Sequence, residues 1–147
     1  MYLIKKNIMS KLENHLINSK ECEKLVSEYD QSNYKEINRH RSPQKPDSKT
    51  YSIDLEILQD YLKLISSEME KKGIQKKGVQ ISLGKYPEKS SDPKLNPEYL
   101  GYQTVFISPV DLNGSASKSK ESTHEEAEDT SLAALPNLNY MNLCPPN

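Results

Sequence analysis

The stretch at residues 53–73, IDLEILQDYLKLISSEMEKKG, decides the fold of this chain. Its apolar residues recur at alternating steps of three and four, the spacing of one face of an α-helix: Leu55, Leu58, Leu62, Ile65 and Met69. Three further apolar residues widen that face: Ile57, Tyr61 and Leu64. A face of this width predicts a helix that is buried against a sheet.

Both ends of this helix are marked by residues that start or stop helices. Asp54 can accept hydrogen bonds from the first free backbone N–H groups. Lys71 and Lys72 suit the negative end of the helix dipole, and Gly73 can take the left-handed conformation that ends a helix. A second helix is predicted to begin at residue 18, where N-x-x-E forms a capping box, and to lie on the surface of the core.

Three stretches are predicted to be strands, at residues 49–53, 78–86 and 102–108. In the second, three apolar residues alternate with polar ones, which is typical of a strand with one buried face: Val79, Ile81 and Leu83. The third stretch, YQTVFIS, is rich in β-branched and aromatic residues.

Prolines separate these elements. Residues 34–49 contain Pro43 and Pro46, and residues 87–101 are rich in proline as well, so both stretches are predicted to be loops. Pro109 is expected to end the third strand.

These elements predict a small two-layer α+β domain at residues 18–110, preceded by an extension at residues 1–17. A helix between two strands favours a parallel, right-handed crossover, and the last strand can return antiparallel beside the second. We therefore expect a three-stranded mixed sheet that two helices cover on one face.

The chain changes character after the predicted domain. Residues 111–147 carry six acidic and two basic residues, and residues 111–131 are polar and of low complexity, which predicts a disordered acidic linker. Residues 132–147 form an apolar C-terminal peptide. We expect this peptide to dock on a folded surface, either of this chain or of a partner protein.

The strand–helix–strand stretch YSIDLEILQDYLKLI…KKGVQISLGKYP, followed by TVFISP, resembles short uncharacterised proteins of Bacteroidetes-type bacteria. The resemblance covers roughly residues 18–110 and extends to the stretch LNYMNLCPPN. It implies an α+β fold and a bacterial source, and it implies no activity.

The residue pattern offers no catalytic, metal or cofactor site. The histidines His15, His40 and His124 fall in three separate segments, and Cys22 and Cys144 are too few for a zinc site or a disulfide framework. There is no nucleophile elbow and no glycine-rich phosphate loop. We predict no metal, no cofactor and no catalytic residue.

The composition and motifs of the sequence do not favour a nucleic acid or a membrane as a partner. The formal net charge is −1, and neither a recognition-helix pattern nor a stacking platform is present. No apolar run approaches the length of a membrane span, and the first residues do not resemble a signal peptide. The expected location is the cytoplasm, and the oligomeric state stays open.

Two groups of residues are candidates for a binding site. The long loop and its flanks carry tyrosines beside carboxylates: Tyr86, Asp92, Glu98, Tyr99 and Tyr102. The C-terminal peptide carries the second group: Leu138, Tyr140 and Leu143.

The favoured function is a small non-enzymatic binding or regulatory module with a docking C-terminal peptide. One alternative is a small enzyme whose site lies on the open sheet face and the loop at residues 86–102. Another is a toxin-neutralising, immunity-type protein, although such proteins usually rely on strong charge and residues 51–110 are close to neutral.

Overall fold

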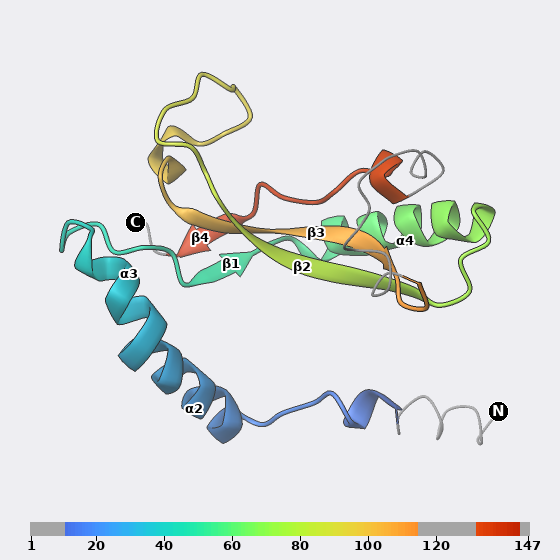
Figure 1. The fold of residues 1–147 in the computed structure, drawn as a ribbon, viewed down its shortest axis with the longest axis horizontal. Coiled ribbons are helices and arrows are strands. Elements are labelled where there is room, and N and C mark those ends of the chain that lie inside the picture. The colour runs from blue at the N-terminus through green and yellow to red at the C-terminus, as the bar shows by residue number, and fades with distance from the viewer. Residues whose placement is uncertain (1–10, 115–131, 145–147) are drawn as a thin grey trace. The chain divides into compact units, whose positions relative to one another are not determined.

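The computed structural model describes residues 11–114 and 132–144 (Figure 1). The chain divides into two compact units, Met1–Gln44 and Lys45–Asn147. The first unit contains helices, and the second combines helices with strands, so the predicted α+β class is confirmed. Within the described residues, no helix has both the length and the apolar character needed to cross a membrane.

The first unit contains α2 (Ser19–Tyr29), a π-helical turn (Asp30–Tyr34) and α3 (Lys35–Arg39). The predicted capping box is present, because Asn18 Oδ1 accepts from the Glu21 N–H at 2.9 Å and Glu21 Oε2 accepts from the Asn18 N–H at 2.8 Å. The prediction of a loop from residue 34 onward is wrong at its start. The helical backbone continues to Arg39, because the prolines that break it come later, at Pro43 and Pro46.

In the second unit, α4 (Leu55–Lys71) is the helix predicted from the apolar periodicity. Asp54 Oδ1 accepts from the N–H groups of Glu56 at 2.8 Å and Ile57 at 3.2 Å. Gly73 has φ +76°, the left-handed conformation expected at the end of the helix. Both predicted helix boundaries are confirmed.

The strands form two separate antiparallel sheets of two strands each. β1 (Thr50–Ser52) pairs with β4 (Asn142–Cys144), and β2 (Lys77–Lys85) pairs with β3 (Gln103–Asp111). The prediction of one three-stranded mixed sheet is therefore wrong. The strands on either side of α4 do not pair in parallel, because the C-terminal peptide supplies β4 as the partner of β1.

The longer sheet continues past the proline that was expected to end it. Pro109 lies inside β3, opposite Val79. Hydrogen-bonded and non-bonded pairs alternate in an antiparallel ladder, and Pro109 occupies a position whose backbone nitrogen points away from β2. No bond of the β2–β3 ladder is lost there, so the strand runs on to Asp111.

The main core lies between α4, β3 and the C-terminal peptide. Its buried members are Tyr61, Ile65, Met69, Ile107, Leu135 and Met141. The buried stripe of α4 therefore runs along Tyr61, Ile65 and Met69. The expectation that Leu62 belongs to the buried face is wrong, since that side chain is 38% exposed.

The C-terminal peptide is packed on its own chain. Ile107 and Leu138 exchange two backbone hydrogen bonds of 2.9 Å, and the peptide then continues into β4 beside β1 (Figure 1). Of the predicted acidic linker at residues 111–131, Asp111 belongs to β3, and residues 115–131 lie outside the described part of the chain.

Candidate functional site

The tyrosines of the predicted binding loop form a second, smaller core. Tyr86 and Tyr102 are buried together with Leu95 and Leu143, and Tyr99 packs against them. The rings of Tyr86 and Tyr99 stack with centroids 6.5 Å apart. The structure thus brings most of the predicted site residues together, but it uses them to hold the long loop and β4 in place.

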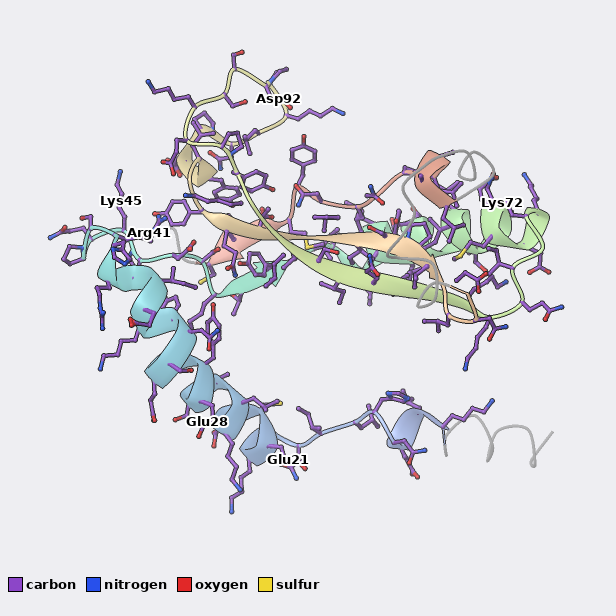
Figure 2. The ribbon with its side chains drawn as sticks, in the orientation of Figure 1. Glu21, Glu28, Arg41, Lys45, Lys72 and Asp92 are labelled. Carbon is purple, nitrogen blue, oxygen red and sulfur yellow. The ribbon has the colours of Figure 1, made fainter. Side chains whose placement is uncertain are left out.

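The carboxylates of the same loop remain exposed. Figure 2 shows Asp92 on the long loop between β2 and β3. The Tyr140 hydroxyl lies 3.5 Å from Asp92 Oδ2, and the negative charge of Asp92 raises the pKa of Tyr140 above its usual value. Tyr140 also has φ +59°, a left-handed conformation that is unusual for a residue with a side chain. Glu98 is exposed in the short 3-10 helix Pro97–Tyr99.

Asn139 connects this region to β3. Its Nδ2 donates to Thr104 Oγ1 at 3.1 Å and to the Val105 carbonyl at 2.6 Å, while its Oδ1 accepts from the Tyr86 hydroxyl at 2.7 Å. These bonds satisfy buried polar groups and fix the peptide along the edge of the sheet. They give the predicted residues a structural role.

A buried polar group that the sequence analysis missed joins β1 to β3. Asp47 Oδ1 accepts from the N–H groups of Ser48 and Gln103, both at 2.8 Å. The fully buried Ser48 Oγ donates to the Gln103 carbonyl at 2.5 Å and lies 2.9 Å from the Tyr51 hydroxyl. The Asp47 carboxylate lies farther from this hydroxyl, at 3.5 Å, and already accepts from two backbone N–H groups, so the group serves to hold the two sheets together. No local motif in the sequence marks it.

Residues 11–114 and 132–144 contain no candidate metal centre. No three His, Cys, Asp or Glu side chains in these ranges gather closely enough to hold a metal ion. Cys22 and Cys144 are both free thiols and exposed.

The most unusual surface lies on β2. Val79, Ile81 and Leu83 pair with Pro109, Ile107 and Val105 of β3, so their side chains point to the same face as the main core. They are nevertheless 43%, 68% and 72% exposed. The expectation that this face of β2 is buried is wrong, because the core between α4 and the C-terminal peptide covers β3 and leaves β2 uncovered. We call these three residues the β2 apolar strip.

The backbone of β2 presents hydrogen-bonding groups at the same place. Ile107 directs its N–H and carbonyl to Leu138, on the side of β3 away from β2. The opposite residue, Ile81, therefore directs its own N–H and carbonyl away from β3, as do Val79 and Leu83. Among the described residues no strand pairs with that outer edge of β2.

Exposed apolar side chains also lie on both flanks of the buried stripe of α4. Four large side chains there are exposed: Leu55, Ile57, Leu62 and Leu64. Single exposed apolar residues are common on protein surfaces, whereas a contiguous strip on an unpaired strand is typical of an interaction site.

No family model, curated protein or solved structure matches the chain, so the resemblance inferred from its motifs stays a prediction.

Proposed function

We propose that this chain is a small non-enzymatic binding module that holds a protein partner on the β2 apolar strip and the adjoining backbone edge. The observation that carries the proposal is the exposure of Val79, Ile81 and Leu83 on the face of the sheet that elsewhere forms the core. Burial of such side chains contributes about 1.5–3 kcal/mol each before the cost of ordering is subtracted.

The C-terminal peptide supports this binding surface from within the chain. It packs Leu135, Met141 and Leu143 into the two cores and occupies the inner edge of β3 through Leu138. Within residues 11–114 and 132–144, the outer edge of the sheet along β2 is thereby left as the edge available to a partner.

The enzyme alternative is less well supported. Tyr86 and Tyr102 are buried, and Tyr86 is hydrogen-bonded inside the protein, so neither presents its hydroxyl to a substrate on the loop surface. A toxin-neutralising role is a form of protein binding, and it would be recognised by the identity of the partner.

Site-specific photo-crosslinking tests the proposal. A photoreactive residue at position 81 should give an adduct with an identified protein in the producing cell, whereas the same residue at the exposed helix position Lys63 should not. Excess unlabelled parent protein should suppress the adduct, and excess Ile81→Lys protein should not. Equal adducts from positions 81 and 63 would refute a binding site on β2.

A further inference from the structure

The residue order of β2 is nearly the same in both directions. Reading KGVQISLGK from either end gives Lys, Gly, an aliphatic residue, a polar residue and then the central Ile81. An antiparallel pair of strands related by a two-fold axis needs this kind of self-complementary order, because each residue meets its mirror position in the other copy.

We propose that the partner held on β2 is a second copy of this chain, paired antiparallel through β2 about a two-fold axis at Ile81. The inference rests on the proposed function, since it names the occupant of the same surface. The two sheets would join into one four-stranded antiparallel sheet, with the two β2 strands at its centre.

The backbone groups match in this register. A two-fold centred on Ile81 sets Ile81 against its own copy and Val79 against Leu83 of the other chain. These are the residues whose N–H and carbonyl groups point outward, so each pair can exchange two hydrogen bonds. The β2–β3 ladder runs without a bulge along all nine residues of β2, and no proline interrupts the outer edge.

The side chains match as well. A two-fold axis perpendicular to the sheet keeps both apolar strips on one face, where directly opposed side chains lie about 4.5–5.5 Å apart. Val79 would then pack beside Leu83 of the other copy, and the two Ile81 side chains would pack against each other. Polar Gln80 would face Ser82 on the opposite face, and glycines Gly78 and Gly84 would face each other without crowding.

In this register, the only like charges that face each other are the lysines at the two ends of β2. Each of these lysines already forms an ion pair within its own chain. Lys77 Nζ lies 2.7 Å from Glu70 Oε1, and Lys85 Nζ lies 2.9 Å from Glu88 Oε2. The hydrogen bond from Lys77, together with its charge, holds the pKa of Glu70 below its usual value. Repulsion between Lys77 and Lys85 of the other copy is therefore offset within each chain.

The mass of the full chain in solution, measured by light scattering or sedimentation over a range of concentrations, tests the inference. We expect twice the monomer mass of 16.8 kDa, falling toward that mass on dilution. Ile81→Lys places two lysines directly against each other and removes the central apolar contact, so the dimer dissociation constant should rise about tenfold or more. Since Ile81 is largely exposed, this variant should keep the fold of the parent.

Two further variants make the test specific. Leu64→Lys makes a similar exchange at an exposed apolar position of α4 and should leave the dimer intact. Ile81→Glu alone should weaken the dimer. An equal mixture of Ile81→Glu and Ile81→Lys should restore it, because only a two-fold axis at residue 81 places the two opposite charges directly against each other.

Other outcomes overturn the second copy as the occupant. A monomer at all concentrations refutes it, and so does a dimer that Ile81→Lys leaves unchanged. If the protein is monomeric while position 81 still crosslinks to a different protein, the binding function holds and only the identity of the partner is wrong. A monomer whose outward β2 amides are protected from hydrogen exchange would mean that another segment of the chain covers this edge.

Discussion

At the scale of single residues, the hydroxyl of Tyr61 connects α4 to two other segments. It donates to the carbonyls of Pro136 at 2.9 Å and Ile107 at 3.1 Å, and burial raises the pKa of this phenol above its usual value. Tyr61→Phe keeps the ring but deprives these carbonyls of this donor, so stability should fall by about 1–2 kcal/mol. Urea unfolding measures this loss.

The matched control is Tyr140→Phe. The Tyr140 hydroxyl is on the surface and makes only a long contact of 3.5 Å with Asp92, so its removal should change stability by less than about 0.5 kcal/mol. Equal losses in the two variants would show that the hydroxyl of Tyr61 is not a structural link.

Ile65 and Leu62 provide a second comparison between residues. Ile65 is 1% exposed in the main core, so Ile65→Asp should abolish folding, because burying an unpaired carboxylate costs several kcal/mol, comparable to the stability of a small domain. Leu62→Asp should give a folded protein. Thermal melts followed by circular dichroism distinguish the two results, and an unfolded Leu62→Asp would mean that the buried face of α4 lies elsewhere.

This pair also shows what the apolar pattern of the helix predicts. The periodicity of residues 55–69 correctly predicted a helix with one buried side, and the caps at Asp54 and Gly73 fixed its ends. At about 100° per residue, these apolar residues span about half of the helix circumference, with Ile65 near the middle of the arc and Leu62 about 60° to one side. The pattern itself therefore favours Ile65 over Leu62 as the centre of the buried stripe. In the structure Ile65 lies in the core with residues of β3 and of the C-terminal peptide, as this geometry requires.

At the scale of elements, β4 is a short strand whose contribution depends on one buried side chain. Leu143 is buried beside Tyr86, Leu95 and Tyr102, and β4 pairs it with Tyr51. Leu143→Ala should therefore cost about 2–4 kcal/mol, as other large-to-small core changes do. Asn142→Ala, at an exposed position of the same strand, should cost less than about 0.5 kcal/mol.

Equilibrium unfolding of these two variants decides whether the peptide is a part of the fold. If Leu143→Ala were as stable as Asn142→Ala, β4 would not be docked on this chain in solution, and the peptide would be free to bind elsewhere. That result would favour the alternative in which the C-terminal peptide docks on a partner protein.

The strands show which features of the sheets could be predicted from sequence. The alternation in residues 78–86 correctly predicted a strand, because an alternating pattern depends only on the local backbone. Its partner and its exposure depend on distant segments. β1 pairs with a strand about ninety residues away, and the core on α4 includes Ile107 and Val105 of β3 but no residue of β2. Neither fact has a local signal in the sequence.

At the scale of the whole molecule, the sequence predicts a binding site on the loop at residues 86–102, whereas the structure favours one on β2. The tyrosines at residues 86–102 were predicted to line a binding surface because tyrosine is common at interfaces. Tyrosine also suits a small core whose edges reach water, and Tyr86 and Tyr102 have that role here. Composition cannot separate these two uses, whereas the exposure of Val79, Ile81 and Leu83 only becomes visible once the strands are paired.

The two hydrophobic cores also bear on how the chain folds. Every residue of both clusters lies within Lys45–Asn147, and α2 and α3 in Met1–Gln44 contain no buried residue. A core that is complete within one unit should fold without the other unit. We therefore expect a fragment of residues 45–147 to unfold in a single cooperative transition.

The matched fragment, residues 1–44, should show weak helicity and no cooperative transition, since short helices without a buried face are marginal in water even with a good capping box. Circular dichroism melts of both fragments test the pair of expectations. A fragment of residues 45–147 that melts without cooperativity would show that its cores need residues 1–44. In that case Lys45–Asn147 would not be an independently folding unit.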